Sequence, residues 1–78
     1  MNTMTIAEFL TDAQIEAALK LYNRYGHWDS VERIESEVIA PNMAAINAKL
    51  GQQNDARYLA YVVVYVFLQV QSQEDQVN

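Results

Sequence analysis

The sequence predicts an all-α fold: a compact bundle of four short helices with the C-terminal helix at its centre. Apolar residues recur at spacings of three and four, which is the period of a helix with one buried face. The 78 residues include only two Gly and one Pro, and each stands at the end of a periodic segment, as helix stop signals do. The predicted helices span residues 12–25, 30–40, 41–50 and 56–72 of a single domain, 1–78, with frayed ends at 1–5 and 73–78.

The first predicted helix begins after Thr11. Gln14 lies three residues later, which completes a capping box. Gly26 follows the last periodic residue and suits a left-handed helix end. The helix therefore runs over 12–25, with its apolar stripe formed by Ile15, Ala18, Leu19 and Tyr22. A weaker capping-box pattern from Thr5 to Glu8 predicts one short turn ahead of it.

The middle of the chain carries two further helices on either side of Pro41. Asp29 and Ser30 are both good helix caps, and Glu32 completes a capping box with Asp29. Pro41 removes a backbone donor and clashes with the preceding turn, so it ends the helix over 30–40. Proline also suits the first turn of a helix, which predicts a separate helix over 41–50. A single helix kinked at Pro41 is the alternative.

The last predicted helix, 56–72, is the element in which pattern and propensity disagree. Residues 62–67 are valines and aromatic residues, which favour strands. The apolar run is long for a strand, however, and no other segment of the sequence reads as its partner. Length therefore favours a helix that is buried on most of its faces, capped by Asn54 or Asp55. A strand over this run is the alternative.

The charge and apolar content of the chain indicate which kinds of molecule it is expected to bind. The formal charge is −5, and the five basic residues are scattered, which disfavours direct binding of nucleic acid or of anionic membranes. The longest apolar run covers eleven residues, whereas a membrane-spanning helix needs about 20. The expected location is the cytoplasm, and the expected partner is a protein of basic or neutral character. Because a chain of this size buries a small core, oligomerisation is the expected reinforcement.

The predicted helix 56–72 is apolar on more faces than short neighbours can cover. A stripe of tyrosines runs beside its core stripe, and tyrosine suits an interface because its body is apolar and its hydroxyl stays hydrated. The sequence therefore predicts a self-association surface, most simply of a dimer, made of Tyr58, Tyr61, Tyr65 and Leu68. The alternative is that these residues only rim a central core helix.

A second aromatic cluster surrounds Gly26. Residues of this kind dominate binding hot spots, so the segment is a candidate surface for a heterologous partner. The predicted partner-binding residues are Tyr25, His27 and Trp28, with the acidic face of Glu32 and Glu35. The competing interpretation makes Trp28 a plug over the end of the bundle, packed on Tyr22 and Val31.

Little in the sequence supports catalysis or a cofactor. The chain has no Cys and one His, which excludes thiolate zinc sites, thiol catalysis and an imidazole-rich metal site within one chain. No Glu-x-x-His motif accompanies the acidic residues, so they are read as solvated faces. Arg57, in the first turn of a helix, is a candidate anchor for an anion.

These patterns favour a small, acidic, non-catalytic protein-interaction module that self-associates and docks on, or inhibits, a larger protein. One alternative is an acidic mimic of nucleic acid that inhibits a nucleic-acid-handling or defence protein. The other is a binder of a small anionic ligand, such as a nucleotide, at a subunit interface with Arg57 as the anchor.

Overall fold

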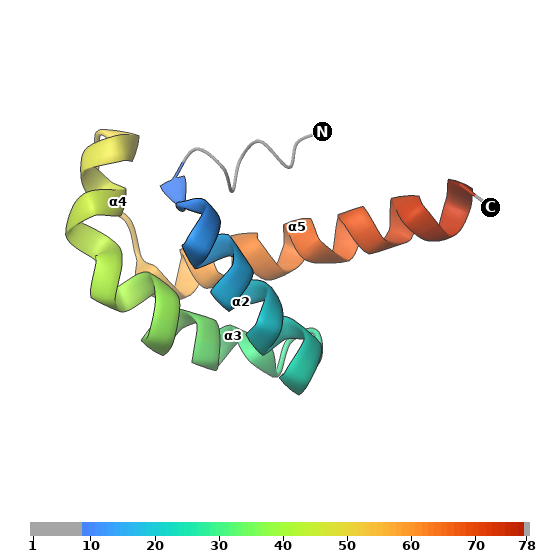
Figure 1. Cartoon of the computed structure of the whole chain (residues 1–78). Helices are drawn as coiled ribbons and strands as arrows, with labels where there is room; N and C mark the ends of the chain where they lie inside the picture. Colours follow the sequence, from blue (N-terminus) through green and yellow to red (C-terminus); the bar gives the residue numbers. More distant parts are fainter. Residues whose placement is uncertain (1–8, 78) are drawn as a thin grey trace.

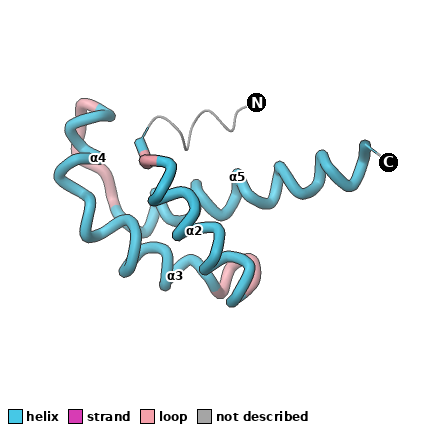
Figure 2. Tube along the Cα trace, in the orientation of Figure 1, coloured by secondary structure: helices cyan, strands magenta, loops and turns pink. Residues whose placement is uncertain are grey.

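Three helical segments, packed on one hydrophobic core, make up the part of the chain that the computed structural model describes, residues 9–77, with side chains described for 9–71. Helix α2 spans Asp12–Tyr25, a continuous helical path runs from Ser30 to Leu50, and α5 spans Ala56–Val77 (Figure 1). No strand occurs among these residues (Figure 2). The all-helical prediction is therefore confirmed, and the strand alternative for residues 62–67 is wrong.

Helix α2 begins as the sequence predicts. The backbone N–H of Gln14 donates to Thr11 Oγ1 at 3.2 Å, and the backbone N–H of Thr11 donates to Gln14 Oε1 at 2.8 Å. This reciprocal capping box satisfies backbone donors that have no partner within the helix. The short turn predicted from Thr5 to Glu8, and the frayed segment 1–5, lie outside the described residues.

The path from Ser30 to Leu50 is one helical segment rather than the two separate helices predicted. It comprises α3 (Ser30–Ile34), a π-helical turn η1 (Glu35–Ile39), a 3-10 turn η2 (Ala40–Asn42) and α4 (Met43–Leu50). The path bends between α3 and α4 in Figure 1. The bundle of four helices is thus not confirmed, and the path resembles the alternative of one helix bent near Pro41.

The irregular turns accommodate Pro41. Proline has no backbone N–H, so the regular i to i−4 ladder cannot continue through it. Just before the proline, the N–H of Ala40 donates to the carbonyl of Glu35, five residues back. Just after it, the side-chain amide of Asn42 donates to the carbonyl of Val38 at 2.7 Å. Wider turns and one side-chain donor therefore keep the helix continuous.

The predicted capping box at the start of α3 is wrong. Asp29 has helical backbone angles and makes no capping hydrogen bond through its side chain. Ser30 is fully buried, and its hydroxyl donates to the carbonyl of His27 at 2.8 Å. Because the turn at 27–29 already runs in a helical sense, the start of α3 is supported by backbone bonds of that turn, such as Ser30 N–H to the Gly26 carbonyl at 3.1 Å.

Helix α5 packs through one face only, so its predicted place at the centre of a bundle is not what the structure shows. α3, η1 and α2 contact it, while its last turns extend beyond the other helices (Figure 1). It continues to Val77, five residues past the predicted end at 72, because the added residues include good helix formers such as Gln and Glu. The buried apolar residues that α5 contributes to the core are Leu59, Ala60, Val63, Val64, Val66 and Phe67.

None of the helices in the described part of the chain has both the length and the apolar character needed to cross a membrane.

The two helix-ending glycines predict different responses to substitution. Gly51 has φ 75° and ψ 19°, in the left-handed region that Asn tolerates. Gly26 has φ 88° and ψ 175°, a conformation open essentially to glycine alone. A β-carbon would meet no heavy atom within 4 Å at either position, so the backbone alone sets the cost. Gly26→Asn is expected to lower the free energy of unfolding by about 1–3 kcal/mol.

Gly51→Asn is the matched control and is expected to cost less than about 1 kcal/mol. Urea denaturation of both variants measures the difference. Equal losses at the two positions would show that the backbone at Gly26 is not restricted to glycine.

Candidate functional site

The face of α5 that points away from the core carries large aromatic side chains. Tyr58, Tyr61 and Tyr65 are 62%, 45% and 55% exposed. Spacings of three and four residues place them on one side of the helix. Gln69 continues this side and donates from its amide to the Tyr65 hydroxyl at 3.1 Å. The tyrosines predicted from the sequence therefore do form one exposed stripe.

Trp28 joins this stripe from a different segment. Its ring centroid lies 5.9 Å from that of Tyr61, with the two planes inclined by 47°. The indole remains 51% exposed, so the interpretation of Trp28 as a buried plug on Tyr22 and Val31 is wrong. The short turn between α2 and α3 carries the indole to α5 instead. We call Trp28, Tyr58, Tyr61 and Tyr65 the aromatic surface.

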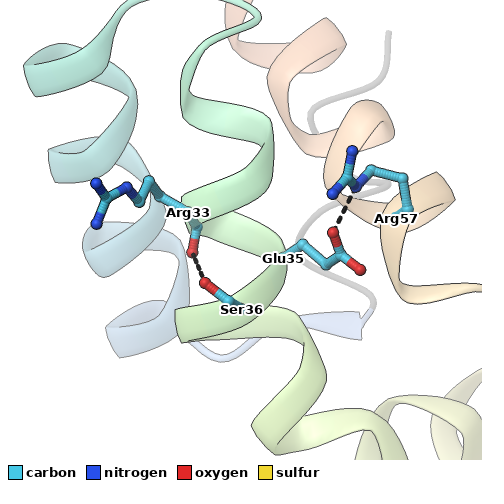
Figure 3. A network of polar contacts seen from close by, with 4 residues as sticks. All are labelled: Arg33, Glu35, Ser36 and Arg57. Atoms are coloured by element: carbon cyan, nitrogen blue, oxygen red, sulfur yellow. Dashed lines mark hydrogen bonds and ion pairs between the residues drawn. The ribbon is translucent and has the colours of Figure 1, made fainter.

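An ion pair borders the aromatic surface. Arg57 Nε on α5 donates to Glu35 Oε1 on η1, and Figure 3 shows the two side chains directed toward each other. This hydrogen bond is the main cause that raises the pKa of the Arg57 guanidinium, and Tyr61 contributes in the same direction. The residue predicted as an anion anchor is thus already engaged by a carboxylate of its own chain.

Three acidic residues in and next to α3 follow Trp28 closely in the sequence. Glu32 is exposed and lies one helical turn from Glu35 and four residues after Trp28. Arg33 faces elsewhere: in Figure 3 its side chain is directed toward α2, whereas that of Glu35 is directed toward α5. We call Asp29, Glu32 and Glu35 the acidic edge.

Tyr25 and His27, which were also predicted to bind a partner, make their aromatic contacts with residues outside the aromatic surface. The Tyr25 ring is half-buried and has the guanidinium carbon of Arg33 at 4.8 Å and that of Arg24 at 5.5 Å from its centroid. These cation–π contacts occupy Tyr25 within the chain. Tyr25 therefore contacts Arg24 and Arg33, whereas Trp28 contacts Tyr61.

His27 is exposed in the turn between α2 and α3, and it contacts Tyr22 rather than the aromatic surface. Its ring stacks on Tyr22 with centroids 5.6 Å apart, and Tyr22 in turn contacts Phe67 at 5.3 Å. The Tyr22 hydroxyl donates to Gln71 Oε1 at 2.9 Å, which ties the end of α2 to α5. Burial raises the pKa of the Tyr22 phenol. His27 thus extends the packing around Tyr22.

Leu68 marks the limit of the aromatic surface. It is half-buried and packs against the core cluster, so only part of it is available for contact with another molecule. Among the predicted self-association residues, the three tyrosines therefore carry most of the exposed area.

Sequence reasoning treated the tyrosine stripe and the Trp28 segment as two separate sites, whereas the structure joins them. One feature of the sequence does relate Trp28 to the residues that border the tyrosine stripe. Trp28, Glu32 and Glu35 follow one another at spacings of four and three. That spacing places them on one side of the path that leads into η1. Which neighbouring helix this side faces depends on tertiary packing and was not predicted.

Within residues 9–71, no group of three or more His, Cys, Asp or Glu side chains is arranged to bind a metal ion. Every buried side-chain nitrogen or oxygen in the same range has a hydrogen-bond partner. No protein-family model, curated protein or solved structure matches this chain.

Proposed function

We propose that this protein is a small, acidic, non-catalytic interaction module that docks on a larger protein through its aromatic surface. The observation that carries the proposal is the meeting of four large aromatic side chains, each 45–62% exposed, from two separate segments. Trp and Tyr are the residue types that contribute most to binding energy when a partner covers them. Exposed aromatic residues gathered in this way mark interaction sites more often than chance exposure does.

The hydrophobic core is complete without these residues. The buried cluster draws on α2, the path from Ser30 to Leu50, and α5, and its members are less than 9% exposed. The tyrosines of α5 lie on the opposite side of the helix, where their burial within one molecule is partial. Their apolar area is therefore available to a second molecule, which favours a docking role over a structural one.

Self-association is the form of docking that we propose for the protein alone. The tyrosine stripe runs about 10 Å along α5, from Tyr58 to Tyr65, at a rise of 1.5 Å per residue. Two such stripes related by a twofold axis present the same residues to each other, as in most dimers. Each copy carries a net charge of −5, so mutual repulsion keeps the dimer weak and the surface exchangeable.

Sedimentation equilibrium over a range of concentrations tests this proposal. The wild-type chain is expected to associate, and Tyr65→Asp is expected to weaken association at least about tenfold, because it places like charges at the centre of the contact. Leu19→Asp is the matched control: Leu19 is also apolar and 40% exposed, but it lies on α2. A wild-type chain that stays monomeric at every concentration, or equal effects of the two variants, would exclude self-association through α5.

The anionic-ligand alternative is less favoured by the geometry. Arg57 pairs with Glu35, so much of its positive charge is already compensated. The nucleic-acid mimic differs from the interaction module in its response to salt. A surface made only of carboxylates releases its partner at moderate ionic strength, whereas contacts through exposed aromatic rings retain part of the binding. Partner capture at two salt concentrations separates these possibilities.

A further inference from the structure

We propose that the aromatic surface and its acidic edge together form a receptor for an arginine-rich segment of the partner protein. This inference rests on the proposed docking function and names the chemistry of the partner. Three observations support it. The border of the exposed rings is acidic, the nearby basic residues are already paired within the chain, and arginine binds well to aromatic faces.

The border of the aromatic surface is acidic. Asp29 and Glu32 are exposed, and Glu35 is half-buried in its pair with Arg57. The residues three and four positions from Glu32, where a helix brings side chains together, are Trp28, Asp29, Glu35 and Ser36. None of these neighbours is basic. Within residues 9–71, Arg57 with Glu35 is also the only ion pair that the structure shows. The edge therefore has negative charge to offer a partner.

The basic residues nearest to this edge are already engaged. Arg57 is held by Glu35, and Arg33 is directed toward α2 with its guanidinium over the Tyr25 ring (Figure 3). A second copy of this chain would bring another acidic edge to the surface. A partner segment of opposite charge avoids that repulsion and gains attraction to Glu32, which makes it the stronger occupant.

The aromatic rings favour arginine over lysine in that segment. A guanidinium stacks flat on a tyrosine or tryptophan face and also pairs with a carboxylate through two hydrogen bonds. This chain already uses Tyr25 in that way, with the guanidinium of Arg33 4.8 Å from its centroid. Among the described residues, no cation of the chain itself lies over the rings of Trp28, Tyr58, Tyr61 or Tyr65. These faces are available to a guanidinium from outside.

A fluorescently labelled octa-arginine peptide, followed by anisotropy at fixed ionic strength, tests the inference. The protein is used at a concentration at which it sediments as a monomer. Glu32→Lys is expected to weaken binding at least about tenfold, because it replaces attraction by repulsion at the edge. Glu16→Lys changes the net charge equally at an exposed site on α2 that is not part of the acidic edge, and is expected to weaken binding less than about threefold.

An octa-lysine peptide tests the role of the rings. Wild-type protein is expected to bind octa-arginine about three- to tenfold more tightly than octa-lysine, a preference that Tyr61→Leu is expected to reduce. Circular dichroism confirms that each variant is folded. Equal weakening by Glu32→Lys and Glu16→Lys would show general attraction to an acidic protein and overturn the inference. Equal binding of the two peptides would exclude recognition by the rings.

The same experiments distinguish failure of the arginine inference from failure of the proposed docking function. If octa-arginine fails to bind while wild-type protein still associates through Tyr65, the surface is an interface between copies of this chain. The inference about arginine is then wrong and the docking function stands. If association also fails to depend on Tyr65, both are wrong.

Discussion

Replacing Val64 with Asp is expected to unfold this protein, whereas replacing the next residue, Tyr65, with Asp is expected to leave it folded. Val64 is fully buried, and Tyr65, about 100° further around the same helix, is 55% exposed. An uncompensated carboxylate in an apolar environment costs several kcal/mol or more. A 78-residue domain has only about 4–12 kcal/mol of net stability, at roughly 0.05–0.15 kcal/mol per residue.

Far-ultraviolet circular dichroism with thermal unfolding measures both variants. Val64→Asp is expected to lose most of its helical signal at 25 °C, and Tyr65→Asp is expected to melt within a few degrees of the wild type. Both variants introduce Asp, which has the same helix propensity at either position. The difference in stability between them therefore reports the burial of the replaced side chain. A cooperative, wild-type-like transition for Val64→Asp would mean that this face of α5 is not buried.

Replacing Ile34 with Ala is expected to cost about 2–5 kcal/mol of unfolding free energy, and replacing the larger Trp28 with Ala is expected to cost less than about 1 kcal/mol. Ile34 is fully buried in the core, so its truncation leaves a cavity. Trp28 is 51% exposed and rests against Tyr61, which is itself 45% exposed. Truncation there leaves no cavity and removes one partly solvated aromatic contact.

Urea denaturation with linear extrapolation provides both free energies. Circular dichroism is the signal of choice, because Trp28 is the only Trp in the chain and its removal abolishes tryptophan fluorescence. A loss for Trp28→Ala as large as that for Ile34→Ala would restore the interpretation of Trp28 as a plug. Near-normal stability with weakened partner binding is the result expected for a residue of a docking surface.

Local sequence patterns predicted correctly those features that depend only on neighbouring residues. The first helix was predicted at 12–25 and is observed at Asp12–Tyr25, because the Thr11–Gln14 capping box and Gly26 are both local. The helical state of residues 62–67 followed from length, against the strand propensity of their valines. The predicted break at Pro41 failed because a π turn and the Asn42 amide replace the missing backbone donor, and neither is signalled by the proline itself.

The candidate site was predicted in its parts and not in its assembly. Tyr58, Tyr61 and Tyr65 were expected on one face from their spacing, and they lie on one exposed face. The contact of Trp28 with Tyr61 joins residues 33 positions apart, and the pair of Arg57 with Glu35 joins residues 22 positions apart. Spacing along one helix carries no information about which face of another helix it meets.

The helical class, the ends of α2, the tyrosine stripe of α5 and the acidic charge of the chain all follow from local features of the sequence. These features depend on backbone propensity, capping and the 3.6-residue period, which act over a few neighbouring residues. Three other features depend on long-range packing: α5 is covered on one face, Trp28 lies outside the core, and Glu35 pairs with Arg57. These features depend on which apolar faces of helices distant in sequence are buried against each other. A small chain can bury only part of its apolar area, and no local pattern specifies which part.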